Sequence, residues 1–276
     1  AGDATHRHPP SNGLGSNTSI QDGFNLAWKL AYVIKDKAGA ELLDTYSIER
    51  SPIAKQIVTR ANQSIAEFGP IFEALGLTDT QDPVKMKKNM DERKQNSPKA
   101  EKQRQALREA IAFKKYEFDA HGVEMNHRYK SNSVLTEGDK EPEFKKDKEL
   151  FYQPTTYPGA RIPHAWVYDK TGVKHSLLDL CGKGNFSIFT GIGGEEWLKA
   201  AKNIETQLGI KIQCNIIGPD QDFEDHAGEW SSIREISDSG LILVRPDQHI
   251  CWRSKDMISN SSEKLMDVMK KILHKR

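Results

Sequence analysis

The sequence lacks the features that define several common classes of protein. Its 276 residues contain three cysteines, Cys181, Cys214 and Cys251, each more than thirty positions from the next. This spacing excludes a disulfide framework and a paired zinc or redox motif. No run approaches the roughly 18 apolar residues of a membrane span, and the N-terminus lacks the pattern of a secretory signal. We therefore expect buried, inert thiols and predict a cytoplasmic protein.

An excess of charge of one sign is also missing. Forty Lys and Arg residues face 39 Asp and Glu residues, so the net charge is +1. No overall field then favours nucleic acid or an anionic membrane, and we predict neither as a partner. Residues 82–118 are rich in Lys and Arg but contain acidic residues throughout. A phosphate-binding patch is one interpretation of that stretch; we favour a solvated helical face.

The sequence has enough apolar residues for packed cores, with 37% hydrophobic residues and a mean hydropathy of -0.67. At about 150 residues per domain, its length predicts two domains. Residues 137–148 contain almost no hydrophobic side chains. We therefore place a linker at residues 137–150, between domains at residues 1–136 and 151–276.

Helical periodicity dominates the first domain. Apolar side chains with helical spacing predict an amphipathic helix over residues 18–35, whose apolar stripe consists of Ile20, Phe24, Ala27, Ala31 and Ile34. Thr18 and Gln21 match a capping box, which predicts that the helix begins near Asn17. A second helical stretch from about residue 42 is expected to break at Pro52 and then resume. The opening residues 1–4 read like the end of a strand.

Short strands and helices alternate in the second domain. Strands are predicted at residues 165–168, 185–190, 211–217, 241–245 and 249–253, and helices at 195–208 and 262–274. This order predicts a three-layer α/β sandwich of thioredoxin-like type. The turn at residues 191–196, where a redox-active member would carry C-x-x-C, has no cysteine. A thiol-disulfide oxidoreductase is therefore disfavoured.

Residues 2–25 are the segment best suited to hold a ligand. Gly13 and Gly15 allow close approach of the backbone to a flat or anionic group, and N–H groups around Ser16 and Asn17 are expected at the positive end of a helix. The pair of glycines lacks the third glycine of a dinucleotide fingerprint. From the residues alone, a ligand site and a plain tight turn into a helix both stay open.

The amino-acid sequence of this segment resembles that of a known family. GDATHRHPPSNGLGSNTSIQD at residues 2–22, with NLAWKL at 25–30, resembles the second flavin-binding motif of single-component, FAD-dependent aromatic hydroxylases. LLDTY and ERSP, at residues 42–46 and 49–52, resemble the next element of that family. YPGARIPH and VRPDQH, at residues 157–164 and 244–249, resemble its thioredoxin-like C-terminal domain. The chain thus looks like the C-terminal part of an FAD-binding monooxygenase domain, mostly helical here, followed by a thioredoxin-like α/β domain.

The resemblance implies an activity, cofactors and site residues. The wording is most similar to that of phenol hydroxylases, although many relatives have Phe or Gln at the position of Leu14. It implies that NADPH reduces FAD, that O₂ then forms a C4a-hydroperoxyflavin, and that a phenol such as a chlorophenol is hydroxylated at its ortho carbon to a catechol. The Asp3 carboxylate would accept hydrogen bonds from the ribityl hydroxyls, and Pro10 would lie beside the reacting face of the flavin. The pyrimidine edge would face a run of five residues: Gly13, Leu14, Gly15, Ser16 and Asn17. A homodimer is also implied.

Two parts of the family pattern do not occur in these 276 residues. The G-x-G-x-x-G motif that follows an opening strand and the middle phosphate motif are both missing. We therefore expect a fragment whose catalytic and substrate-pocket residues lie upstream of Ala1, and we assign no catalytic residue. The alternative is a non-enzymatic interaction or dimerisation module that retains a remnant flavin motif and binds no flavin.

His6 and His8 invite a metal-site or general-base interpretation, because histidine is a common ligand and titrates near neutral pH. No third ligand stands at a fitting spacing. We therefore predict no metal site, and expect these side chains to orient the backbone or to line the cofactor pocket.

Overall fold

The computed structural model describes residues 1–275, which form two compact units. The first unit comprises Ala1–Ser19, Ala54–Glu124 and Asp147–Tyr152, and the second comprises Ile20–Ile53, Met125–Lys146 and the chain from Gln153 onward. Helices α1 (Gly15–Ile34) and α2 (Asp44–Ala66) each contribute residues to both units. The division at residues 137–150 stays a prediction.

The first unit is helical. Besides its parts of α1 and α2, it contains the 3-10 turns η1 (Gly2–Ala4) and η2 (Ser11–Gly13), and the helices α3 (Gly69–Ala74), α4 (Pro83–Glu92), α5 (Pro98–Phe113), α6 (Lys115–Phe118) and most of α7 (His121–Met125). Proline at the first position and a side-chain cap start both α4 and α5. Asp82 accepts a hydrogen bond from the Val84 N–H at 2.9 Å, and Ser97 accepts one from the Ala100 N–H at 3.2 Å. The Lys- and Arg-rich stretch therefore forms two capped helices.

Three local expectations at the N-terminal end of the chain were wrong. Residues Gly2–Ala4 form a 3-10 turn and not the end of a strand. Helix α1 begins at Gly15, and the Thr18 N–H already donates to the Leu14 carbonyl at 2.9 Å, so Thr18 lies inside the helix and does not cap it. Helix α2 continues through Pro52. A proline removes only one helical hydrogen bond, and the buried side chains of Glu49 and Ile53 hold the neighbouring turns in place.

The apolar stripe of α1 is largely exposed. Ile20, Phe24 and Ile34 are 69%, 45% and 80% exposed. The buried side chains of this helix in the second unit are mostly polar or aromatic: Asp22, Asn25, Trp28, Lys29 and Tyr32. Hydrophobic periodicity indicates that a helix has an apolar and a polar face, but it cannot show which face is buried against other elements.

The second unit is built on a four-stranded sheet with the order β4-β3-β6-β7. Its strands are β3 (Phe186–Thr190), β4 (Ile212–Ile216), β6 (Leu241–Val244) and β7 (Ile250–Ser254). Strands β3 and β4 are parallel and are joined through α8 (Glu195–Leu208), whereas β6 runs antiparallel to β3 and to β7. Helix α10 (Ser261–Ile272) closes the unit. This is the connectivity predicted for the second domain, and the α/β class is confirmed.

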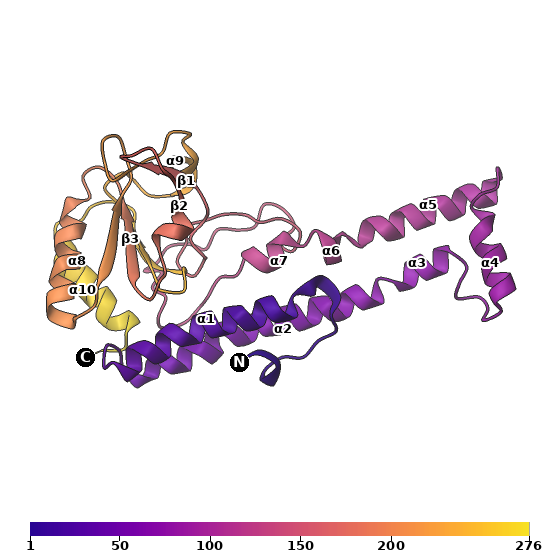
Figure 1. Cartoon of the computed structure of the whole chain (residues 1–276), viewed down its shortest axis with the longest axis horizontal. Coiled ribbons are helices and arrows are strands. Elements are labelled where there is room, and N and C mark those ends of the chain that lie inside the picture. Colours follow the sequence, from indigo (N-terminus) through magenta and orange to yellow (C-terminus); the bar gives the residue numbers. More distant parts are fainter. Residues whose placement is uncertain (276) are drawn as a thin grey trace. The chain divides into compact units, whose positions relative to one another are not determined.

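Both faces of this sheet are covered, which makes β3 and β6 buried at every position. Helices α8 and α10 contact each other on one face (Figure 1), over a core that includes Phe186, Trp197 and Trp252. A second sheet, β2-β1-β5, belongs to the other core, with β1 (Trp166–Asp169), β2 (Lys174–Ser176) and β5 (Phe223–Glu224). The remaining short elements are η3 (Ala40–Leu43), η4 (Leu177–Leu180) and α9 (Glu229–Ile233).

The thiols lie in apolar surroundings, as expected. Cys181 and Cys251 are buried and Cys214 is half-buried. Burial raises the pKa of Cys181 to about 12 and that of Cys214 to about 11, and it raises the pKa of Cys251 further. In the part of the chain that the structure describes, no helix is long and apolar enough to cross a membrane.

Candidate functional site

Six of the seven residues predicted to hold a cofactor form one continuous turn into α1. This turn, residues 10–17, is called the glycine loop below; Pro10 precedes η2, Leu14 is buried, and α1 starts at Gly15. The backbone is left-handed at Asn12 and Gly13, with φ angles of 66° and 62°. Such angles favour glycine and, among other residues, asparagine. The loop therefore depends on the residue types that the sequence places there.

The glycine loop ends in a group of unused backbone donors. Among the hydrogen bonds of the described residues, none has the backbone N–H of Gly15, Ser16 or Asn17 as its donor. A Cβ built on Gly13 would meet no atom within 4 Å, so the loop is open on that side. The first N–H groups of a helix have no partner within the helix and carry its positive end. This arrangement suits a bound group with negative charge or carbonyl oxygens.

Asp3, the seventh predicted residue, lies in the separate turn η1. Its side chain is exposed. A Cβ on neighbouring Gly2 would lie 3.2 Å from Ser19 Oγ, so the η1 backbone approaches the first turns of α1 closely. The turn that contains Asp3 therefore lies close to α1, and among the described residues the Asp3 side chain makes no hydrogen bond or ion pair with the glycine loop.

The two histidines lie close together, and His8 lies next to Gly15 of the glycine loop. Their rings stack, with centroids 6.3 Å apart. His8 Nδ1 lies 2.8 Å from the Pro9 carbonyl oxygen, and a Cβ on Gly15 would lie 3.5 Å from His8 Cε1. Over the described residues, no group of three or more His, Cys, Asp or Glu side chains is placed to hold a metal ion. The contacts of His8 are those of a side chain that supports the loop.

The glycine loop is also attached to a distant helix of the same unit. Asn12 Nδ2 donates to the backbone carbonyl of Tyr116 at 2.7 Å and to that of Glu117 at 3.3 Å. A cavity of about 400 Å³ opens beside this attachment. Its lining consists of Asn12, Leu14, Glu117, Phe118, Asp119, Ala120, His121 and Glu124. Sequence reasoning did not assign Asn12 or this cavity.

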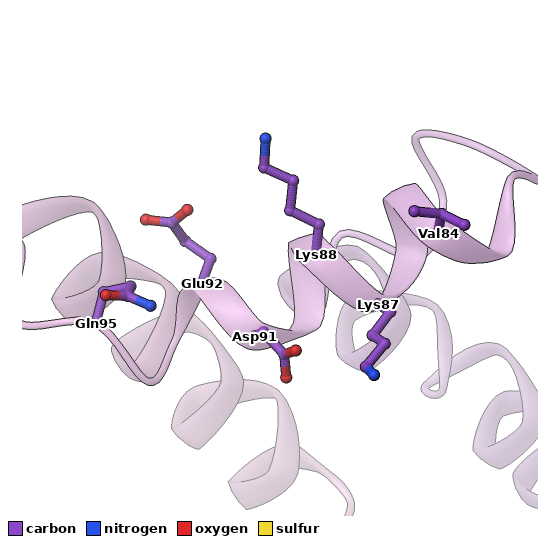
Figure 2. Close-up of a pocket in the computed structure, with 6 residues that line it drawn as sticks. All are labelled: Val84, Lys87, Lys88, Asp91, Glu92 and Gln95. Atoms are coloured by element: carbon purple, nitrogen blue, oxygen red, sulfur yellow. The ribbon is translucent and has the colours of Figure 1, made fainter.

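A second hollow lies on the Lys- and Arg-rich stretch, and its side chains do not converge. It is lined by Val84, Lys87, Lys88, Asp91, Glu92 and Gln95. Figure 2 shows Lys87 and Lys88 pointing to opposite sides of α4. Carboxylates stand among the ammonium groups, and Asp91 pairs with Lys94 at 2.6 Å. The solvated helical face remains the interpretation of this stretch.

A buried charge cluster in the second unit was not predicted. Glu49 on α2 accepts two hydrogen bonds from the guanidinium of Arg245, at 2.6 and 2.9 Å, and one from Lys29 Nζ at 2.7 Å. Arg245 also donates to Asp247 at 3.1 and 2.5 Å. The name Glu49 cluster is used for the six residues joined in this way: Asn25, Lys29, Glu49, Ser131, Arg245 and Asp247. Two cations balance two anions, so the cluster carries no net charge.

The pKa values of the Glu49 cluster follow from burial and pairing. Burial acts to raise the pKa of Glu49, but Arg245 and Lys29 outweigh it and hold that pKa well below its usual range. Burial also opposes ionisation of Asp247, whose pKa is nevertheless lowered because Arg245 lies beside it. For Lys29, burial prevails over the attraction of Glu49 and lowers the pKa to about 8. All four groups are thus charged at neutral pH.

One signal in the sequence could have indicated this cluster. Arg245 directly follows the apolar strand β6, in which every residue is buried, so its side chain had to find partners inside the unit. The pairing with Glu49, 196 positions away, could not have been read from the sequence. Arg50, next to Glu49, donates separately to Asp22 at 2.7 Å and to the Tyr129 hydroxyl at 3.2 Å.

Comparisons with known families agree with this architecture. Residues 1–61 match the family described as FAD binding domain, and residues 155–275 match the family described as aromatic-ring hydroxylase, C-terminal. The chain is 51% identical to 2,4-dichlorophenol 6-monooxygenase of Delftia acidovorans, over 99% of this chain and 46% of that protein. It is 49% identical to phenol 2-monooxygenase of Pseudomonas sp. strain EST1001, over 98% of this chain and 44% of that protein.

Solved structures give the same result. The flavin-dependent monooxygenase PieE, solved in complex with FAD and substrate, superposes with a TM-score of 0.93 at 40% identity, over 100% of this chain and 47% of that one. Aklavinone-11 hydroxylase, solved with FAD and aklavinone, superposes with a TM-score of 0.72 at 27% identity, over 100% of this chain and 43% of that one. The chain thus spans about half the length of the relatives it matches. Two parts of the chain therefore match known families: residues 1–61 match the FAD binding domain family, and residues 155–275 match the aromatic-ring hydroxylase C-terminal family.

Proposed function

We propose that this chain forms part of the flavin site of an FAD- and NADPH-dependent monooxygenase that converts a phenol to a catechol. The observation that carries the proposal is the row of unused N–H groups at Gly15, Ser16 and Asn17, at the start of α1. Relatives of about 50% identity are named as a dichlorophenol monooxygenase and a phenol monooxygenase. A phenol, with chlorophenols as the first candidates, is therefore the proposed substrate class.

The donor set of the glycine loop fits a flavin. The pyrimidine edge of reduced FAD carries negative charge near N1 and O2, and preorganised N–H donors at the positive end of a helix stabilise such charge. The loop offers three of these donors and an open side at Gly13. Ser16 and Asn17 are exposed and free to face the cofactor, while buried Leu14 fixes the loop from behind.

The other predicted residues take supporting roles in this proposal. The exposed Asp3 carboxylate would accept hydrogen bonds from the ribityl hydroxyls, and Pro10 would lie beside the flavin ring. When bound and reduced by NADPH, FAD supplies the activation of O₂ that hydroxylates the ortho carbon of the phenol. The residues of this chain hold the cofactor in one orientation and keep its anionic edge against N–H donors.

We also propose a homodimer, and domains at residues 1–136 and 151–276.

The test uses the full-length protein and a charge placed at the start of α1. We expect the parent protein to bind FAD, to oxidise NADPH faster when phenol or 2,4-dichlorophenol is added, and to release a catechol. Ser16→Asp introduces one carboxylate among the N–H donors, and we expect it to weaken FAD binding about tenfold. Val84→Asp is the matched control, because Val84 occupies the same second position of an exposed helix, α4.

Three results would count against this function. A parent protein without bound FAD would favour the non-enzymatic module. NADPH oxidation that ignores phenols, or that yields no catechol, would remove the substrate class. Equal FAD affinities of Ser16→Asp and Val84→Asp would remove the assigned role of the α1 N-terminus.

A further inference from the structure

Asn12 is the only residue of the glycine loop for which the structure gives a side-chain hydrogen bond to a segment about a hundred positions away in the sequence. Its Nδ2 donates to the carbonyl oxygens of Tyr116 and Glu117, at 2.7 and 3.3 Å, 104 and 105 positions further along the chain. Its backbone has a φ of 66°, and Gly13 follows with a φ of 62°. The side chain thus attaches the loop at the point where the backbone turns into the left-handed region.

The segment that receives Asn12 is itself held in place within the same unit. The Tyr116 hydroxyl donates to Asp147 at 2.7 Å, and the guanidinium of Arg60 lies over the Tyr116 ring, 5.2 Å from its centre. Lys114, just before α6, is buried and donates to the Ser64 carbonyl at 2.6 Å. Asn12 is therefore attached to a firm support and not to a free loop.

The chemistry of the contact specifies an amide. Two carbonyl oxygens face Nδ2, and Oδ1 is buried without a hydrogen-bond partner among the described residues. An aspartate has the same shape but no N–H donor, so its carboxylate would meet two carbonyl oxygens. A glycine would keep the left-handed backbone and lose the attachment, and an alanine would lose the attachment and strain the backbone.

We propose that Asn12 is a positioning residue for the flavin: its attachment to α6 sets the direction of the N–H groups of Gly15, Ser16 and Asn17. This inference rests on the proposed function. Only two residues, Gly13 and buried Leu14, separate Asn12 from the start of α1. A shift of the loop at Asn12 therefore moves the donors that face the cofactor.

The experiment separates attachment from backbone conformation. Asn12→Gly, Asn12→Ala and Asn12→Asp are made in the full-length protein, and FAD affinity, the visible circular dichroism of bound flavin and the melting temperature are measured. We expect Asn12→Gly to weaken FAD binding about tenfold and to change the circular dichroism of the flavin. Asn12→Ala and Asn12→Asp should bind FAD more weakly than Asn12→Gly does. The matched control is Asn89→Ala, because Asn89 Nδ2 also donates to a backbone carbonyl, that of Gly76 at 2.8 Å, within the helices α3 to α5. Its FAD affinity and flavin dichroism should equal those of the parent.

The outcomes distinguish this inference from the function on which it rests. If the parent binds FAD and Asn12→Gly shows the same affinity and dichroism, Asn12 is not a positioning residue and the proposed function stands. A lower melting temperature alone, with FAD binding intact in all three variants, also overturns the inference. If the parent binds no FAD, the proposed function falls and the inference falls with it.

Discussion

Glu49 shows how much a single buried side chain contributes to this molecule. Its carboxylate accepts hydrogen bonds from Arg245, Lys29 and Ser131, and it is fully buried. Removal of one partner from a buried ion cluster leaves charges without compensation, which costs about 3–5 kcal/mol. We therefore expect Glu49→Ala to lower the free energy of unfolding of this chain by about that amount, as measured by urea titration.

An exposed ion pair gives the control for Glu49. Glu196 pairs with Lys199 at 2.5 Å on the surface of α8, with both side chains more than half exposed. Surface pairs contribute little, because water screens them. Glu196→Ala should leave the urea midpoint unchanged. A Glu49→Ala variant as stable as Glu196→Ala would show that the buried cluster adds nothing to stability.

At the scale of single residues, the sequence predicted only those features that depend on neighbours close along the chain. The glycine loop is contiguous, so its glycines and a helix that follows them could be predicted from residues 10–17 alone, although the first helical residue, Gly15, could not. The partners of Asn12 and Glu49 could not be predicted in this way. Tyr116 and Ser131 are more than 80 positions from Asn12 and Glu49, respectively, and Lys29, which donates to Glu49, lies on another helix.

At the scale of elements, helix α1 offers the clearest test of the structure. Trp28 is buried, and its ring contacts those of Tyr32 and Phe186 with centroids 5.5 and 5.8 Å away. Ile34 belongs to the apolar stripe of the same helix but is 80% exposed. We expect Trp28→Ala to cost about 3–5 kcal/mol of unfolding free energy. Ile34→Ala should change it by less than about 0.5 kcal/mol.

The two variants are matched because they lie on one helix and both shorten an apolar side chain. Urea titration of this 276-residue chain measures both. A large loss for Ile34→Ala together with a small loss for Trp28→Ala would mean that the apolar stripe faces the core after all. The orientation of α1 could not be predicted, because the polar side chains opposite the stripe are buried only through partners from other elements.

The stability of the whole molecule is expected to fall in mild acid. Burial lowers the pKa of His249 to about 4, while an unfolded histidine titrates at about 6.5. Between pH 6.5 and about 4, the His249 imidazole is therefore protonated in the unfolded chain and neutral in the folded chain. The contribution of His249 to the free energy of unfolding is fully present above about pH 6.5 and is lost as the pH falls towards 4. The lowered pKa values of Glu49 and Asp247 add a further loss below about pH 4.5.

Urea midpoints at pH 7.5, 6, 5 and 4 measure this dependence. His249→Phe keeps a ring against Tyr129, whose centroid lies 4.0 Å from that of His249, and removes the titrating group. The variant should lose less stability than the parent between pH 6.5 and 5. Parallel curves for parent and variant over this range would exclude His249 as the source.

The sequence by itself predicted most of the helices and strands and, through a resemblance, a flavin-binding segment at the start of the chain. Alternation of short apolar runs with helical stretches predicted the connectivity of the second unit, because a parallel pair needs a crossover and a hairpin does not. A local motif specifies the glycine loop, because left-handed turns and helix starts depend on adjacent residues. Only the tertiary structure decided which face of α1 is buried, where Asn12 is attached and how Glu49 meets Arg245. Burial and charge pairing are properties of residues brought together from distant parts of the chain, and a residue type cannot show which partner it will meet.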